Sequence, residues 1–288
     1  MNADLQSYVI RTSQAAGHTS ISELANVICA KHKDVMAVLA YGSALRDANP
    51  ENTLIDYYLL TQSIDGVSEN SVSRLLCQRI PPNVYYAEAT LGGKNVRSKY
   101  AVLPMELLAQ KLKPTTANPY FWARFAQPMQ IIWTRDDLAR KRVQQLLIRA
   151  METANAHAQE LAPSVPVSER WVALFRNTYR TELRPEDSSR AALIVEMQQE
   201  HFETISKLAN PVTPAAMPWS LRRWQGKALS LARLLKAAFT FQGGADYAAW
   251  KIKRHSGVDI PITDWHRRHP ILASLLLLPK LLRKGGLK

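Results

Sequence analysis

Val35-Met-Ala-Val-Leu-Ala-Tyr41, followed directly by Gly42-Ser43, is the stretch of sequence that decides the fold. It is short and nearly all apolar, which is typical of a strand that is covered on both faces. Thr53 to Thr61 (TLIDYYLLT) is a second such strand, and only Asp56 interrupts it. A lone carboxylate is costly in a buried strand, so Asp56 is the first residue for which we expect a function.

Further helices and strands surround this pair in a regular order. For the first half of the chain we predict the order α, β, β, α, β, β, α. The other elements are helices from Ser20 to about Lys33, from Ser71 to Arg79 and from Pro104 onward, and strands from Asn83 to Thr90 and from Lys99 to Leu103 with a Gly92-Gly93 turn between them.

The second half carries helical periodicity alone. Strand patterns stop at Arg135, and helical segments follow at 135–161, 168–183, 186–208, 221–241 and 245–255. We therefore predict an α+β protein in which a mixed sheet with helices comes first. The expected parts are a sheet-containing domain at residues 1–130, an all-helical or winged-helix-like domain at 131–256, and a basic amphipathic tail at 257–288.

Positive charge is concentrated in the last quarter of the chain. The 288 residues include 37 Lys and Arg against 24 Asp and Glu, and residues 221–288 hold 14 of the basic and 3 of the acidic side chains. No apolar run approaches the ~20 residues that span a bilayer, which excludes an integral membrane protein. The N-terminus has no signal or transit pattern, so we expect the chain to stay where it is made. Cys29 and Cys77 are expected to be reduced, buried thiols.

Gly42-Ser43 ends one strand, and Asp56 follows thirteen residues after the serine in the next. This arrangement resembles the core of the nucleotidyltransferase superfamily. Glycine lets a triphosphate approach the backbone, and the Ser43 hydroxyl can donate to a terminal phosphate oxygen. Asp56 would hold Mg2+, which neutralises charge on the transferring phosphorus. The alternative is a plain turn followed by a strand-end Asp in a hydrogen bond.

A second metal ligand is not evident near Asp56. The superfamily usually places another carboxylate two residues on, and that position is Tyr58. The candidates for the missing ligand are Glu88, which projects from its strand on the same side as Tyr86, and Asp65, just beyond the Asp56 strand. For both, a surface or strand-edge carboxylate is the alternative.

Longer blocks of sequence resemble one branch of the superfamily, the mitochondrial-type CDP-diacylglycerol synthase family, also known as the mitochondrial translocator assembly and maintenance protein. The blocks keep the family's order and span about residues 38 to 254. They are Tyr41-Gly42-Ser43, Leu54-Ile55-Asp56-Tyr57, Val84-Tyr85-Tyr86, Lys99-Tyr100-Ala101-Val102, Ala123-Arg124-Phe125-Ala126-Gln127-Pro128, Leu183-Arg184-Pro185-Glu186-Asp187, Gly226-Lys227-Ala228-Leu229, and Tyr247 with Lys251 and Lys253.

Two positions bear on how closely the chain follows that family. The family tends to have an apolar residue where Tyr58 stands, so Tyr58 fits it. Gln127 departs from the family's lysine, and a phosphate contact is either lost there or moved to Lys113 or Lys111. The missing transit peptide suggests a bacterial-like member.

The resemblance implies a nucleotidyltransferase-fold mixed sheet, a following helical domain, and a phosphatidate cytidylyltransferase activity. CMP would pass from CTP to phosphatidate, giving CDP-diacylglycerol and pyrophosphate, with Mg2+ as the cofactor. Tyr41, Gly42 and Ser43, with Arg124 and Arg184, would bind the nucleotide.

Cations should matter more than a strong base in this reaction, because the phosphatidate phosphate is already an anion. Lys99, which follows a turn beside the proposed site, is the first choice for a catalytic cation alongside Asp56. Arg124 and Arg184 are the next choices. A solvated strand-end lysine, or an arginine paired structurally with Glu186 or Asp187, is the alternative.

The C-terminal tail combines charge with leucines. Residues 265–288 contain six Lys or Arg and no acid around the apolar stretch Ile271 to Leu282. We expect the tail to dock on an anionic membrane surface. The expected contact residues are Trp265, Arg267, Arg268, Leu275, Leu278, Lys280 and Arg283. The alternative is a C-terminal helix whose leucines pack on the protein's own core.

An enzyme that uses phosphatidate must visit the bilayer. We therefore expect a cytoplasmic protein, peripheral on the inner face of the cell membrane, with no stable nucleic-acid partner. Two other functions stay open at this point. One is a nucleotidyltransferase acting on RNA or protein, which the basic helices from Arg222 to Arg254 would suit. The other is a catalytically inactive membrane-associated binding protein, which Tyr58 makes possible.

Overall fold

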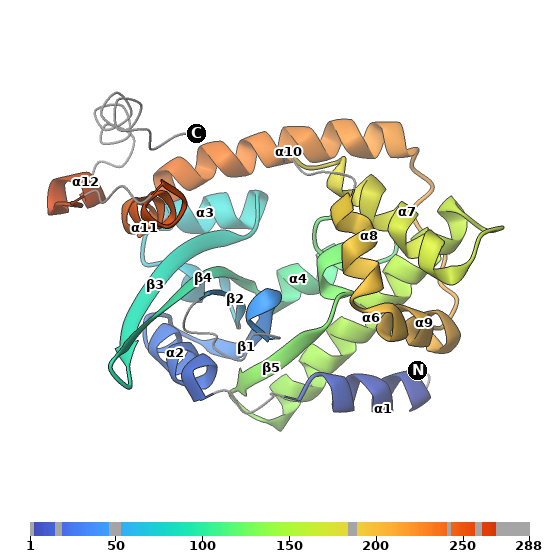
Figure 1. Cartoon of the computed structure of the whole chain (residues 1–288), viewed down its shortest axis with the longest axis horizontal. Coiled ribbons are helices and arrows are strands. Elements are labelled where there is room, and N and C mark those ends of the chain that lie inside the picture. The colour runs from blue at the N-terminus through green and yellow to red at the C-terminus, as the bar shows by residue number, and fades with distance from the viewer. Residues whose placement is uncertain are drawn as a thin grey trace.

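The computed structural model describes residues 3–14, 19–45, 53–183, 189–240, 243–256 and 261–268 of the chain. The expected α+β class is confirmed, because a mixed five-stranded sheet is followed by a helical region (Figure 1). The strands are β1 (Val35–Tyr41), β2 (Leu54–Thr61), β3 (Asn83–Leu91), β4 (Lys94–Pro104) and β5 (Met129–Thr134), in the spatial order β3-β4-β2-β1-β5. β2 and β4 are parallel, and the other neighbours are antiparallel.

The sequence located the two central strands within a residue and was less accurate at the margins of the sheet. β5 was not predicted, because a six-residue edge strand directly after a proline gives little periodic signal. β4 begins at Lys94, not at Lys99, since its polar first half pairs with β3 along the whole hairpin. The predicted division at residue 130 falls inside β5 and remains a prediction.

The helices of the first half are α1 (Ala3–Thr12), α2 (Thr19–Cys29), α3 (Ser71–Arg79), α4 (Met105–Lys111) and α5 (Trp122–Phe125), with 3-10 turns η1 (Ser43–Leu45) and η3 (Ile64–Val67). Those of the second half are α6 (Asp137–Leu161), α7 (Val167–Tyr179), α8 (Ser189–Glu196), α9 (Gln199–Leu208), α10 (Trp219–Thr240), α11 (Gly244–Ser256) and α12 (Asp264–Arg268). The described residues after Thr134 contain no strand, as expected of an all-helical region.

Two helical predictions were wrong in detail. The segment 186–208 was expected to be one helix, but it contains α8 and α9 separated at Gln198, whose backbone (φ −135°, ψ 28°) leaves the helical region. α1 was not predicted. It lies beside α6 and α9, so the N-terminus packs on the helical half of the protein (Figure 1).

One face of the sheet is closed by tyrosines that reach backbone groups of the covering elements. The Tyr57 hydroxyl donates to the Ile21 carbonyl of α2 at 2.7 Å, and the Tyr85 hydroxyl donates to the Val67 carbonyl of η3 at 2.7 Å. Cys77 of α3 is buried against the Val102 carbonyl, so its predicted burial is confirmed, whereas Cys29 at the end of α2 is only half-buried and the prediction was wrong for it. This face of the sheet is therefore covered by α2, α3 and η3.

Helix α10 is fixed to the body of the protein by two buried cations. The Arg222 guanidinium donates to the carbonyls of Ala117, Ala215 and Met217. The Lys236 ammonium donates to the Ile80 and Pro82 carbonyls, each at 2.6 Å, and to Asn83 Oδ1 at 3.0 Å. Burial lowers the pKa of Lys236 to about 8, which still leaves it protonated at neutral pH. Both side chains are therefore structural and are not available to a nucleic acid.

A buried histidine ties α1 to the rest of the fold. The Tyr8 hydroxyl donates to His201 Nδ1 at 2.7 Å, and His201 Nε2 donates to the Ala126 carbonyl at 2.9 Å. Burial lowers the pKa of His201 to about 4. The neutral ring therefore links α1, α9 and the end of α5.

We predict that the free energy of unfolding falls as the pH drops from 7 to 5. The unfolded chain takes up a proton at His201 near pH 6.5, whereas the folded chain resists until about pH 4, a loss of about 2 kcal/mol over that window. His201→Gln should remove this share of the pH dependence, measured by urea unfolding at several pH values. Equal slopes for wild type and His201→Gln would contradict the prediction.

Candidate active site

Four residues lie side by side across the open face of the sheet. Tyr41 of β1 pairs with Asp56 of β2, Asp56 with Lys99 of β4, and Lys99 with Tyr86 of β3. Paired residues project on the same face, at a strand spacing of about 5 Å. The sheet therefore brings together Asp56 and Lys99, the two residues that the sequence singled out as catalytic.

Gly42 places the chain backbone against the Asp56 carboxylate. Its φ of +88° lies in the region that favours glycine, and a Cβ atom built on it would stand 3.5 Å from Asp56 Oδ2. Ser43 follows at once, exposed, as the first residue of η1. The predicted Gly-Ser turn and the predicted carboxylate therefore border the same space.

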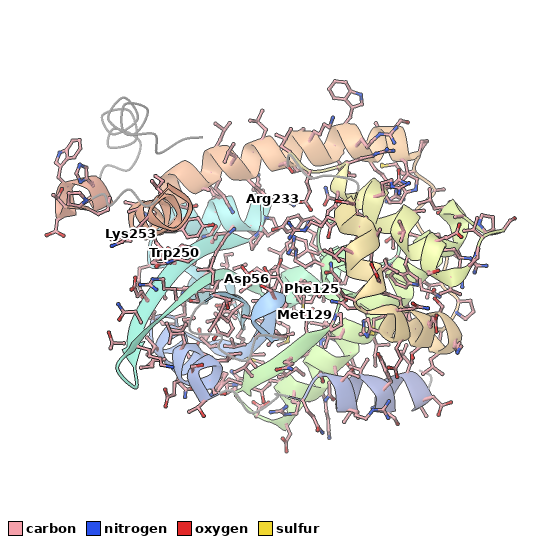
Figure 2. All side chains as sticks on the ribbon, in the orientation of Figure 1. Asp56, Phe125, Met129, Arg233, Trp250 and Lys253 are labelled. Atoms are coloured by element: carbon pink, nitrogen blue, oxygen red, sulfur yellow. The ribbon has the colours of Figure 1, made fainter. Side chains whose placement is uncertain are left out.

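Helix α11 covers the same face from the β3 side. A Cβ atom on Gly243, just before the helix, would be only 3.0 Å from Tyr86 Cβ, and the Tyr247 ring centroid lies 5.8 Å from that of Tyr86. Burial, and then the negative charge of Asp56, raise the pKa of Tyr247. Tyr247 therefore forms a wall beside Asp56, and Figure 2 shows Trp250 on the same helix.

On the other side, two arginines flank a tyrosine ring. Arg124 Cζ lies 5.5 Å from the Tyr41 ring centroid and 5.7 Å from that of Tyr120, and Arg233 Cζ lies 3.9 Å from Tyr120. Both distances to Tyr120 suit cation–π contact. Arg124 Nε is buried without a hydrogen-bond partner. Lys99 of β4 and Arg124 of α5 therefore lie on the two sides of the Asp56 position, while Arg233 of α10 lies on Tyr120.

The carboxylates considered as further metal ligands are not gathered at Asp56. Glu88 lies roughly 12 Å away, two strands over and two residues along. It pairs with Arg97 at 2.8 Å and accepts from the Tyr86 hydroxyl at 3.1 Å. Asp65 lies in η3, beyond Thr61 at the far end of β2, and Thr61 itself is roughly 17 Å along the strand from Asp56. Asp65 is exposed and pairs with Arg74 at 3.3 Å.

Tyr58 explains why β2 carries a single carboxylate. It projects on the same face as Asp56 and is buried, with ring centroids 5.2 Å from Tyr41 and 4.7 Å from Phe125. A carboxylate there would stand in an aromatic core. Within the described residues no three His, Cys, Asp or Glu side chains meet at a potential metal site. Asp56 alone still fits Mg2+, which binds through one or two carboxylates and takes its other ligands from water and substrate phosphates.

Several predicted residues cannot be placed. Arg184 lies outside the described residues, as do Leu275, Leu278, Lys280 and Arg283 of the tail. Arg267 and Arg268 belong to α12, and Trp265 of the same helix is exposed. In the described part of the chain, no helix combines the length and the apolar character needed to cross a membrane.

Tyr247, which lies beside Asp56, was not predicted as a site residue, and neither were Tyr120 and Arg233, which lie beside Arg124. A signal for Arg233 existed, because Arg222, Gly226, Arg233 and Lys236 share one face of a helix with 3.6 residues per turn. A Cβ atom on Gly226 would be 2.5 Å from the Thr181 carbonyl oxygen, so this face has to be the inward one. Tyr120 precedes a four-residue helix and gave no usable pattern.

Comparisons with known proteins give little beyond this geometry. No protein-family model matches the chain, and no curated protein matches it. Among solved structures, one similar chain is a nucleotidyltransferase-like protein from Exiguobacterium sibiricum 255-15, with 13% sequence identity over 92% of each chain and a TM-score of 0.28. A TM-score of that size does not establish a common fold.

We predict that Gly42→Ala and Gly92→Ala have similar effects on stability and different effects on binding. Both glycines have positive φ, +88° and +55°, so each substitution should cost about 1–2 kcal/mol of unfolding free energy. Only at Gly42 does the new methyl fill space beside Asp56, since nothing lies within 4 Å of a Cβ atom on Gly92. Titration with CTP, the nucleotide that the sequence resemblance implies, should show about tenfold weaker binding for Gly42→Ala alone. Equal CTP affinity in the two variants would contradict the assignment.

Proposed function

We propose that this protein is a phosphatidate cytidylyltransferase, which transfers CMP from CTP to phosphatidate and releases pyrophosphate. The observation that supports it best is the placement of Asp56 beside the Gly42 backbone and next to Lys99. The resemblance of the sequence blocks to the CDP-diacylglycerol synthase family supplies the substrate class. Arg124, whose guanidinium lies against the Tyr41 ring, adds positive charge beside Asp56 for the two anionic substrates.

The transfer makes one bond and breaks one. A phosphate oxygen of phosphatidate attacks the α-phosphorus of CTP, and the bond from that phosphorus to the oxygen bridging to the β-phosphorus breaks, so the electron pair leaves with pyrophosphate. The nucleophile carries no proton that must be removed, so no general base is required. The residues of the site act by holding two anions in line.

Each residue then has a defined task. The Gly42 backbone and the Ser43 hydroxyl bind the terminal phosphates, and Tyr41 bounds the site beside them. Lys99, Arg124 and Arg184 are the cations that offset charge on the transferring phosphoryl group. Asp56 would hold Mg2+, which would supply positive charge to offset the negative charge of the triphosphate. With one protein carboxylate, the metal should bind well only together with the nucleotide.

The decisive test is incubation with CTP, Mg2+ and phosphatidate vesicles while pyrophosphate is measured. We predict that Asp56→Asn lowers turnover at least about a hundredfold, because a lost metal ligand costs several kcal/mol in the transition state. Asp65→Asn is the matched control and should keep turnover, since that exposed carboxylate lies at the far end of β2. Product from ATP or RNA in place of CTP and phosphatidate would favour a nucleotidyltransferase with another substrate. No pyrophosphate with any substrate would favour a binding protein.

The outer face of α10 supports contact with a bilayer. Its exposed large apolar side chains are Leu221, Trp224, Leu231, Leu234 and Leu235, with Trp224 exposed to 76%. Arg223 and Lys227 lie beside Trp224, and the helix contains no acidic residue. Apolar residues flanked by cations and a tryptophan are typical of a helix in the membrane interface. We therefore propose a peripheral protein on the inner face of the cell membrane, held by α10 and by the basic tail.

We predict that Trp224→Ser with Leu235→Ser weakens sedimentation with anionic liposomes at least about tenfold, because each buried apolar side chain contributes about 1.5–3 kcal/mol. Leu138→Ser with Leu193→Ser removes equally exposed apolar side chains from α6 and α8 and should leave sedimentation unchanged. Deleting residues 269–288 should weaken it further without changing CTP affinity. If only the deletion has an effect, the tail alone holds the protein to the membrane.

A further inference from the structure

A pocket that the proposed reaction does not use lies where α3, α4 and α10 meet. Its polar wall consists of Arg79, Lys111, Asn118 and Arg233, and its apolar wall includes Ile80, Phe121 and Leu229. The empty volume is about 310 Å3, with open solvent at its mouth included. Arg79 and Lys111 stand at the last turns of α3 and α4, so three separate elements direct a cation to this place.

The pocket is strongly positive. No acidic side chain is among the residues that line it. The carboxyl ends of α3 and α4 each contribute about half a negative charge. Three full positive charges therefore outweigh the two helix ends. Glu182, which acts on Arg233, lies instead with Arg124 in a separate pocket that Tyr120 lines.

Arg233 is held in place before any ligand arrives. Its Nε donates to the Pro81 carbonyl at 3.0 Å, and its guanidinium stacks on the Tyr120 ring. Burial lowers the pKa of Arg233, because the interactions of the charged guanidinium inside the protein do not fully replace its lost hydration. The Lys236 contacts with Ile80 and Pro82 fix the turn that carries the pocket wall. A rigid cation with an apolar wall opposite suits an anion that has an organic part.

We propose that this pocket is a second anion site, which binds the phosphate group of a phosphate monoester while Ile80, Phe121 and Leu229 contact its organic part. The phosphate could belong to a soluble metabolite or to the headgroup of a lipid such as phosphatidate. The proposal does not depend on the transferase activity, because it rests on residues other than Gly42, Ser43, Asp56 and Lys99.

The test is titration of the full chain, without CTP or Mg2+, with glycerol 3-phosphate and, separately, with phosphatidate or phosphatidylcholine vesicles. Arg79→Ala with Lys111→Ala should weaken binding of at least one phosphate probe about tenfold. Arg176→Ala with Lys207→Ala removes the same charge from exposed positions on α7 and α9 and should have no effect.

The two probes distinguish the sources of the phosphate. If Arg79→Ala with Lys111→Ala binds glycerol 3-phosphate more weakly than the wild type does, the ligand is soluble. If the double variant binds only phosphatidate vesicles more weakly, the ligand is a lipid headgroup. Equal binding by the two double variants, or no binding of either probe to the wild type, would overturn the proposal. Arg79→Gln, a single change at an exposed residue, repeats the test should the double variant not fold. This titration measures binding, whereas the test of the proposed function measures pyrophosphate. Absence of the second anion site can therefore be told apart from absence of the transferase reaction.

Discussion

The parallel pairing of β2 with β4 is the constraint on which the site depends. Antiparallel neighbours can be joined by a short turn, but parallel strands need a crossover, and here the chain passes through η3, α3 and β3 between them. The crossover elements η3 and α3 contact the face that Tyr57 and Tyr85 also close. The opposite face is thereby left for Asp56 and Lys99. A slip of one residue in this pairing would turn one of the two side chains to the wrong side of the sheet.

A second constraint joins two segments that lie far apart in the sequence. α10 reaches back across about 150 residues of sequence, and the Lys236 ammonium and Arg233 Nε occupy the backbone carbonyls of Ile80, Pro81 and Pro82. Charge-assisted hydrogen bonds to buried carbonyls are stronger than neutral ones, and loss of either cation would leave those carbonyls unsatisfied. α10 therefore belongs to the architecture of the site although it lies in the helical half. Arg222, Arg233 and Lys236 on its inward side bind backbone carbonyls of the protein. Its outward side carries exposed apolar residues that can contact another surface.

The sequence could predict what local patterns determine. β1 and β2 are continuous apolar runs, so their limits and the isolation of Asp56 follow from the order of the residues alone. The metal ligands could not be predicted in this way, because the distance from Asp56 to Glu88 or Asp65 depends on strand order and register, which periodicity does not report. Tyr58 is a similar case, since only the packing of Tyr41 and Phe125 around it shows that the position is part of the core. Arg233 and Tyr120 meet only in the folded chain.

Arg233 lies between the two regions of positive charge, because its guanidinium borders the α3–α4–α10 pocket and also stacks on Tyr120, beside Arg124. A single charge shared in this way makes the two regions thermodynamically dependent on each other. An anion bound on one side would neutralise part of the field that attracts an anion to the other side. By linkage, the reduction in affinity must be the same in both directions. If both proposed ligands bind, the position of this one side chain makes each of them weaken the binding of the other without any contact between them.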